Sequence, residues 1–146
     1  MTMKLLLVEQ QYVQATWHYV RELLQQPLDL NLGEFTSEDV YQWLLNGQMQ
    51  LWVLVDPKFG GILLAAVTEF VTYPREKRLR MVLVGSKPNT IDHWLDFCWK
   101  DDSALMQYAR DNGVKRIEST GRDGWTKVLG KVGFSKYYTV LTKEVN

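Results

Sequence analysis

The spacing of apolar residues in the first half of the chain predicts two helices and four strands. Between residues 10 and 26 the apolar positions recur every three or four residues, which is typical of an amphipathic helix that ends at Pro27. Ser37 is expected to cap a second, shorter helix, which Asn46 and Gly47 terminate. Shorter apolar runs bounded by turn residues predict strands, at residues 3–9, 49–55, 62–73 and 79–84.

The second half of the chain predicts helices that alternate with strands. A helical pattern covers residues 91–112, with Asn89 or Thr90 as its cap, a break at residues 101–103 and Gly113 at its end. A strand, a helix and a last strand are then expected, at residues 114–120, 122–132 and 134–144. The element order is β-α-α-β-β-β-α-β-α-β. It predicts an α/β (α+β) fold whose mixed sheet contains one parallel pair.

Composition favours one domain with its own core. The chain has 146 residues, 46% of them hydrophobic, so residues 1–146 are expected to fold as a single domain without disulfide bonds. Its one cysteine, Cys98, is expected to be a small buried side chain, and no metal-ligand spacing accompanies it. A lone cysteine favours a reducing compartment, and residues 1–8 are too short an apolar run for a signal peptide or membrane span. The protein is therefore expected in the cytoplasm.

Charge narrows the range of partners. Seventeen basic residues balance 17 acidic ones, so net charge gives no general attraction to nucleic acid or to an anionic membrane. The densest local charge lies near one turn, at Arg75, Lys77, Arg78 and Arg80. It is interpreted either as a site for a phosphate or an acidic partner, or as a strand edge kept soluble by charge. His18 and His93 have no triad partner or ligand pattern, and are expected on the surface or as satisfied interior residues.

Three segments near the C-terminus carry a motif. They read Tyr-Ala-Arg-Asp-Asn-Gly-Val-Lys-Arg-Ile-Glu at residues 108–118, Gly-Arg-Asp-Gly-Trp at residues 121–125 and Val-Gly-Phe at residues 132–134. With the element order, they resemble the GNAT family of N-acetyltransferases, and in particular GNAT-like proteins of tailed phages, which often carry a Gly-Arg-x-Gly-Trp and Gly-Phe segment here. The resemblance implies the GNAT fold, and the host cytoplasm as location if the chain is phage-encoded.

The resemblance also implies acetyl-CoA as the acyl donor. In working GNAT enzymes the fourth strand splays from the fifth, and the pantetheine arm pairs with the exposed strand edge. The cofactor-binding residues implied are Met81, Val82, Leu83, Val84, Gly85, Ser86, Lys87 and Arg122. The family's glycine-rich pyrophosphate loop is replaced by Gly-Ser-Lys-Pro-Asn-Thr at residues 85–90, a degenerate version with one glycine. Lys87 is expected either to pair with phosphate or to lie in an ordinary solvated turn.

Acyl transfer also requires a base for the amine and an acid for the departing thiolate. Glu69 and Glu118 are the acidic residues in the predicted central strands, and either is a candidate base, directly or through water. The family's tyrosine position is held by Leu129, which cannot donate a proton. Tyr137 or Tyr138 is therefore the candidate acid.

Two functions stay open. The first is an N-acyltransferase that uses acetyl-CoA to acylate an amine on a small molecule or a protein. The second is a GNAT-like binding or structural module without catalysis, which has a protein partner. The degenerate loop, Leu129, and the bulky Trp125 at a small-residue position of the family helix favour the second function. Neither hypothesis includes a metal, a membrane or a nucleic acid.

Overall fold

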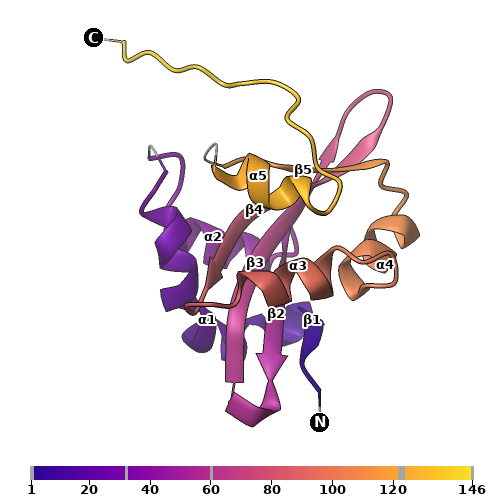
Figure 1. The fold of residues 1–146 in the computed structure, drawn as a ribbon. Helices are drawn as coiled ribbons and strands as arrows, with labels where there is room; N and C mark the ends of the chain where they lie inside the picture. The colour runs from indigo at the N-terminus through magenta and orange to yellow at the C-terminus, as the bar shows by residue number, and fades with distance from the viewer. Residues whose placement is uncertain (1, 32, 60, 122–123, 146) are drawn as a thin grey trace.

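The computed structural model describes residues 2–31, 33–59, 61–121 and 124–145, and a five-stranded mixed sheet lies at its centre (Figure 1). The strands, in spatial order, are β1 (Lys4–Val8), β2 (Met49–Asp56), β3 (Gly61–Thr72), β4 (Lys77–Ser86) and β5 (Arg116–Ser119). The first three pairs are antiparallel and the β4–β5 pair is parallel, which confirms the predicted mixed sheet. The helices between β4 and β5 supply the crossover that a parallel pair needs.

Two helices cover one face of the sheet. α1 (Val13–Leu28) packs on β3 and β4, and α2 (Ser37–Leu45) packs on α1 and β2. The apolar stripe of α1, which includes Val13, Val20 and Leu24, is buried against alternate strand residues such as Leu51 and Val67. A short 3-10 turn, Gln10–Tyr12, leads into α1. The amphipathic pattern therefore identifies both the helix and the face that it buries.

Three helices cover the opposite face: α3 (Ile91–Cys98), α4 (Ala104–Asp111) and α5 (Gly124–Gly130) (Figure 1). The predicted break between α3 and α4 is confirmed, because the Ser103 hydroxyl accepts the Met106 N–H (3.0 Å) and donates to the Cys98 carbonyl (2.6 Å). Cys98 is fully buried, as expected, and burial raises the pKa of its thiol. Within the described part of the chain, no helix has both the length and the apolar character needed to cross a bilayer.

Two predicted helix ends are wrong in detail. α1 does not end before Pro27 but continues to Leu28, and the Asp29 N–H still reaches the Gln25 carbonyl (2.9 Å). Proline lacks an N–H and its ring crowds the carbonyl four residues earlier, but α1 ends one residue after Pro27, so almost no helix lies beyond the distortion.

The cap of α2 is Thr36 rather than Ser37. The Thr36 hydroxyl accepts the Asp39 N–H (3.3 Å), and the Asp39 carboxylate accepts the Thr36 N–H (2.8 Å). A reciprocal capping box pairs the cap with a side chain three positions later. Asp39 stands at that distance from Thr36, which explains why Thr36 rather than Ser37 is the cap.

The largest difference from prediction lies at the C-terminal end. The expected strand at residues 134–144 is wrong, because residues 134–145 form no ladder with any described strand. Gly133 has a φ of 95°, and the chain that follows α5 leaves the body as an extended segment (Figure 1). We call residues 135–145 the C-terminal tail. Every residue of the tail is exposed.

Candidate functional site

β4 has two halves that differ in their neighbours. On one side it pairs with β3 along its whole length, from Lys77 to Ser86. On the other side it pairs with β5 only from Arg78 to Met81. Among the described strands, residues 82–86 therefore have a neighbour on one side alone, and we call them the open edge of β4. They include five of the eight residues that the sequence assigns to cofactor binding, and Met81 lies at their start.

A β-bulge separates the two halves. Thr68 of β3 lies opposite Met81 and Val67 lies opposite Leu83, so Val82 is an additional residue in β4. The bulge changes the faces of the strand, since Met81 packs in the core with α3, α4 and α5 while Leu83 packs in the core with α1 and α2. The open edge thus begins at an irregularity in the sheet, a common position for functional residues.

Gly85 brings helix α1 directly onto the open edge. A Cβ atom at this position would lie 1.8 Å from the carbonyl oxygen of Leu23, which is part of the α1 backbone. Only glycine fits there without a shift of the helix or the strand. The α1 side of the open edge is therefore closed by backbone packing.

Some backbone N–H and C=O groups of the open edge point away from β3, to the side on which β5 pairs with the first half of β4. The Lys87 N–H donates to the Leu63 carbonyl of β3 (2.8 Å), so Lys87 faces β3. Successive residues of a strand direct their N–H and C=O groups to opposite sides, so Gly85 also faces β3 while Val84 and Ser86 face away from it. Val84 and Ser86 thus present donors and acceptors to any extended chain that lies beside β4.

The connection from β4 to α3, within the described residues 85–92, differs from a glycine-rich phosphate loop. The Lys87 N–H is already donated to β3 and Pro88 has no N–H. The Thr90 hydroxyl donates to the Lys87 carbonyl (2.7 Å) and does not cap α3, while Asp92 places negative charge in the first helical turn. The exposed side chain of Lys87 is the cation of this connection.

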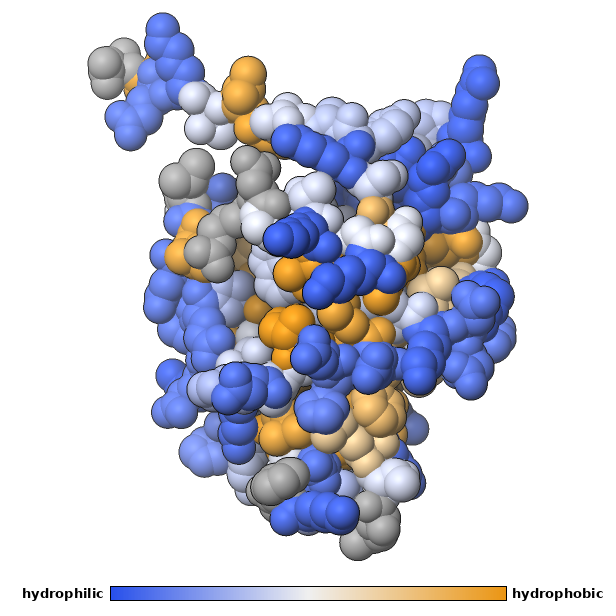
Figure 2. All heavy atoms as spheres, viewed as in Figure 1, coloured by the Kyte–Doolittle hydropathy of each residue, from blue (hydrophilic) through white to orange (hydrophobic). Residues whose placement is uncertain are grey.

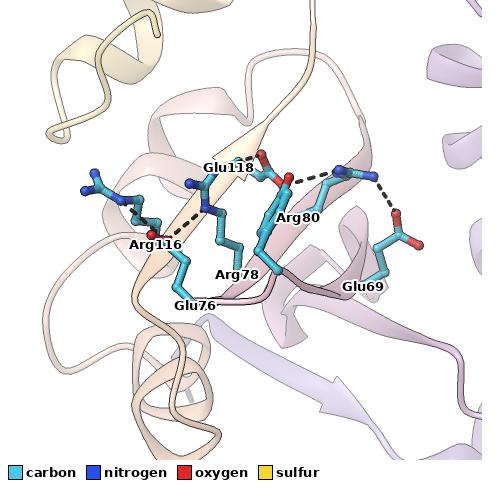
Figure 3. Close-up of polar contacts among 7 residues, drawn as sticks. Glu69, Glu76, Arg78, Arg80, Arg116 and Glu118 are labelled. Carbon is cyan, nitrogen blue, oxygen red and sulfur yellow. Dashed lines mark hydrogen bonds and ion pairs between the residues drawn. The ribbon is translucent and has the colours of Figure 1, made fainter.

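A row of ion pairs crosses the sheet just before β4 and β5 separate (Figure 3). Arg80 of β4 donates to Glu69 of β3 (3.2 Å) and to Glu118 of β5 (3.3 Å). Arg80 pairs with Glu118 in the ladder, one position before the last pair between the strands. Its neighbours Leu79 and Met81 point into the core with α3 to α5, so the row lies on the opposite face. The two carboxylates predicted as bases are therefore brought together by one guanidinium group.

The row of ion pairs continues away from the point where β4 and β5 separate, which we call the split. Glu118 also accepts the Tyr73 hydroxyl (3.3 Å) and lies 3.7 Å from Arg78. Arg78 donates to Glu76 (2.9 Å), and Arg116 lies 3.5 Å from the same carboxylate. The hydrogen bond from Arg78 is the largest influence on Glu76 and lowers the pKa of that carboxyl group. These contacts fasten the turn before β4 to β5.

Arg80 is the central charge of the row. Its partial burial acts to lower the pKa of the guanidinium, but the carboxylates of Glu118 and Glu69 outweigh this effect and the pKa is raised. Its Nε atom is buried and has no partner among the described groups. Arg80 therefore stays charged and holds two carboxylates in place beside the split.

Comparison with solved structures shows the fold. An aminoglycoside acetyltransferase from an uncultured soil metagenomic sample, in complex with sisomicin, superposes with a TM-score of 0.71 at 9% identity, over 99% of this chain and 95% of that chain. A predicted acetyltransferase from Clostridium acetobutylicum with acetyl-CoA gives 0.66 at 15% identity, over 98% and 96%. Glucosamine-6-phosphate N-acetyltransferase from Arabidopsis thaliana gives 0.65 at 15% identity, over the full length of both chains. The chain has a GNAT-like fold. No protein-family model and no curated protein matches its sequence.

In this GNAT-like fold the remaining predicted site residues do not gather at the open edge. Tyr137 and Tyr138 contact each other on the C-terminal tail, where their side chains are 83% and 63% exposed. Leu129, at the family's tyrosine position, is buried in the core with α3 to α5. Arg122 lies outside the described residues. The assignments of a base, an acid and a cofactor site remain predictions.

Aromatic side chains connect α3 and α5, the two helices beside the split. Trp125 at the start of α5 meets Trp94 of α3 edge-on, with ring centroids 5.4 Å apart. It also covers Gly121, where a Cβ atom would lie 3.0 Å from the Trp125 ring. Apolar surface is visible between α5 and α3 (Figure 2), and half-buried apolar residues of this region include Val84 and Val128. The indole thus occupies space beside the point where the chain leaves β5.

Sequence reasoning missed two features of the site. The bulge at Val82 is not visible in the strand pattern, because a single additional residue in an apolar run looks like any other apolar position. The sequence does single out Arg80 as part of a charged cluster, but not that it bridges Glu69 and Glu118. The glycine in an apolar strand at position 85 was the available signal of a close backbone approach.

Proposed function

We propose that this chain is an acyl-CoA-dependent N-acyltransferase, whose acceptor is an amine on a small molecule or a protein. The observation that carries the proposal is the open edge of β4 within a GNAT-like fold. The outward N–H and C=O groups of Val84 and Ser86 suit the two amides of a pantetheine arm, which would lie beside β4 like an added strand.

The acceptor would approach from the opposite face of the sheet. The row of ion pairs lies on that face. The pairing of β4 with β5 ends one residue after the pair formed by Arg80 and Glu118. An amine placed between the strands would meet the thioester carbonyl beside Arg80 and its carboxylates. Glu118, or Glu69 through a water molecule, would remove the amine proton after exchanging its contact with Arg80 for one with the substrate.

The reaction would then proceed as acyl transfer. The amine nitrogen attacks the thioester carbonyl carbon, and outward N–H groups of β4 stabilise the oxyanion. Collapse of the intermediate forms the amide and breaks the carbon–sulfur bond, and CoA leaves as a thiolate that takes up a proton. Tyr137 or Tyr138 would donate this proton only if the C-terminal tail docks against the sheet, because both side chains are otherwise in solvent.

Most of the binding energy is expected from the pantetheine arm rather than from the phosphates. The connection from β4 to α3 offers the Lys87 side chain, but the Lys87 N–H is already donated to β3, Pro88 has no N–H, and Asp92 opposes a second negative charge. We therefore expect S-acetylpantetheine to bind within about tenfold of acetyl-CoA.

A non-catalytic binding module is the second candidate. It is favoured by the burial of Leu129 where the family has a tyrosine, and by the engagement of Glu69 and Glu118 with Arg80. Such a module would retain the fold and the partner-binding surface without turnover.

The test is calorimetric titration of the full chain with acetyl-CoA, CoA and S-acetylpantetheine, followed by a thiol-release assay against a panel of amines. Lys87→Ala and Lys87→Arg serve as a matched pair for the contribution of phosphate. A ligand at a hundred times its dissociation constant should also add about 2.7 kcal/mol to the free energy of unfolding. Binding with thiol release supports the enzyme, whereas binding without release for any amine favours the module. Absence of binding by all three ligands contradicts the proposal.

A further inference from the structure

Basic side chains from two segments gather at the end of the sheet where β4 and β5 begin. Arg75 and Lys77 belong to the turn before β4 and to its first residue, and Lys115 and Arg116 lie where the chain enters β5. The Lys115 N–H donates to the Lys77 carbonyl (2.9 Å), and the parallel ladder pairs Arg78 with Arg116. The two segments are therefore held side by side. We call Arg75, Lys77, Arg78, Lys115 and Arg116 the basic surface.

The charge of the basic surface is only partly compensated. The Glu76 carboxylate is shared by Arg78 (2.9 Å) and Arg116 (3.5 Å). The Glu118 carboxylate is divided between Arg78 (3.7 Å) and Arg80 (3.3 Å). Among the described residues, no carboxylate forms an ion pair with the other three cations of the surface, which are Arg75, Lys77 and Lys115. Positive charge is thus in local surplus, although the 17 basic and 17 acidic residues of the whole chain balance.

The surroundings of the basic surface favour a partner that is recognised by its charge. The Lys77 ammonium lies 4.2 Å from the centre of the Phe70 ring, and the Arg78 guanidinium lies 4.6 Å from that of Tyr73. Phe70 also stacks on Tyr108, with ring centroids 5.7 Å apart. Single-stranded nucleic acid is usually bound by stacking of its bases on free aromatic faces, and the faces here already carry cations. The large apolar side chains that are exposed in the described chain lie outside this surface, so it also lacks an anchor for a membrane.

We propose that the basic surface binds an acidic segment of a partner protein in extended conformation. The three residue steps from Arg75 to Arg78 span about 10 Å in an extended chain, and Lys115 and Arg116 form a second row of cations beside them. A small molecule with one carboxylate or phosphate would meet only part of this surface. Carboxylates that repeat along a peptide can meet both rows, and complementary charge of this kind steers association and fixes orientation. The turn between β3 and β4 projects from the body of the molecule (Figure 1), so a partner can reach it.

This inference does not require acyl transfer, because a binding module would use the basic surface as an enzyme would. Its consequence for the site rests on the proposed function. Arg78 belongs both to the basic surface and to the row of ion pairs, and the pairing of β4 with β5 ends three residues later, at Met81. An acidic segment bound here would lie next to the split. The acceptor amine of the enzyme would then be carried by a protein, close to a group of acidic residues.

The test measures binding of the full chain to a fluorescein-labelled peptide of alternating glutamate and serine by fluorescence anisotropy. A peptide with glutamine in place of glutamate is the control for charge. Arg75→Ala with Lys115→Ala removes two cations that lie outside the row of ion pairs, so the fold should stay intact, which thermal unfolding checks. Arg21→Ala with Lys58→Ala is the matched variant, because it removes the same charge from exposed positions elsewhere.

We expect the glutamate peptide to bind at low salt, to dissociate as salt is added, and to bind about fivefold more weakly to the Arg75 and Lys115 variant. The Arg21 and Lys58 variant should bind as the wild type does. Equal loss in the two variants, equal binding of the glutamine peptide, or no binding at low salt would overturn the proposal. Tighter binding of a single-stranded oligonucleotide or of anionic vesicles would assign the surface to another class of partner and also overturn it. No acyl donor is present, so a negative result here leaves the thiol-release assay to decide the proposed function separately.

Discussion

The two halves of β4 differ both in composition and in surroundings, because the first carries three basic residues and the second carries none. In the half from Lys77 to Met81, strands lie on both sides and ion pairs join β4 to both neighbours. In the half from Val82 to Ser86, β3 lies on one side and the other side has lost β5. In the first half the backbone N–H and C=O groups therefore bond to strands on both sides. In the second half the groups that face away from β3 can bond to a ligand. Two causes create this difference: β5 pairs with β4 only as far as Met81, and only the first half carries the basic side chains that form the ion pairs.

The most disruptive change should be at the place where α1 closes the open half. Gly85→Ala puts a Cβ atom into the carbonyl of Leu23, and we expect it to lower the free energy of unfolding by about 3 kcal/mol. Denaturant unfolding measures the loss. Gly61→Ala is the control, because no atom lies within 4 Å of its added Cβ, and its effect should be below about 1 kcal/mol. Equal effects of the two substitutions would show that the close approach of α1 is not a constraint.

The boundary between the halves should be the next most sensitive point. Thr68 lies opposite the bulge, and its hydroxyl accepts the buried Trp52 Nε1–H (3.0 Å) and donates to Gln50 (2.8 Å). Thr68→Val leaves the indole N–H without a partner and should cost about 1–3 kcal/mol in unfolding free energy. Thr72→Val, at the exposed end of the same strand, should cost less than about 0.5 kcal/mol. A neutral Thr68→Val would argue against this hydrogen-bond chain.

Some elements of the fold could be predicted from the sequence alone, and others could not. The helix that spans Val13–Leu28 and the strands of the central meander could be predicted, because burial imposes a periodic pattern on each of them. The strand expected at residues 134–144 is wrong, since an apolar run can indicate an extended backbone but does not name a partner strand.

The candidate site, like the fold, has parts that the sequence predicted and parts that it did not. The cofactor-binding stretch that family resemblance predicts coincides with the open edge for residues 82–86. The contact of Arg80 with Glu69 and Glu118 joins residues 11 and 38 positions apart, so it depends on strand register, which no local pattern reports. The position of Tyr137 and Tyr138 likewise depends on where the tail goes, which no local pattern reports, so their role stays a prediction.

The open half should be more sensitive in binding than in stability. Ser86→Pro removes an outward N–H, and we expect the affinity for acetyl-CoA to fall about tenfold, or about 1.4 kcal/mol. Ser86→Ala keeps the N–H and should bind as the wild type does. Calorimetric titration measures both variants, and thermal unfolding checks that their folds are intact. If the alanine variant loses as much affinity as the proline variant, the side chain rather than the backbone contacts the ligand.

The smallest effect is expected at the start of the first half of β4, at the half-buried ion pair of Glu76 and Arg78. The hydrogen bond from Arg78 lowers the Glu76 pKa below its ordinary value of 4.5, so the ionised group stabilises the fold above about pH 4.5. This contribution is lost as the pH falls through the folded-state pKa. The stability advantage of the wild type over Glu76→Gln should therefore be present near neutral pH and should shrink in acid. Denaturant unfolding across this pH range measures it, and a difference that does not change with pH would contradict the assignment.

The most direct test of the central claim is the response of individual backbone amides to acetyl-CoA, followed by nuclear magnetic resonance and hydrogen exchange on the full chain. If the open edge of β4 binds the pantetheine arm, the Val84 and Ser86 amides should shift and gain protection. The Lys87 amide, which is already bonded to Leu63, should keep the protection it has. Saturation with acetyl-CoA that leaves Val84 and Ser86 unchanged would contradict the claim that the second half of β4 is a ligand-binding edge.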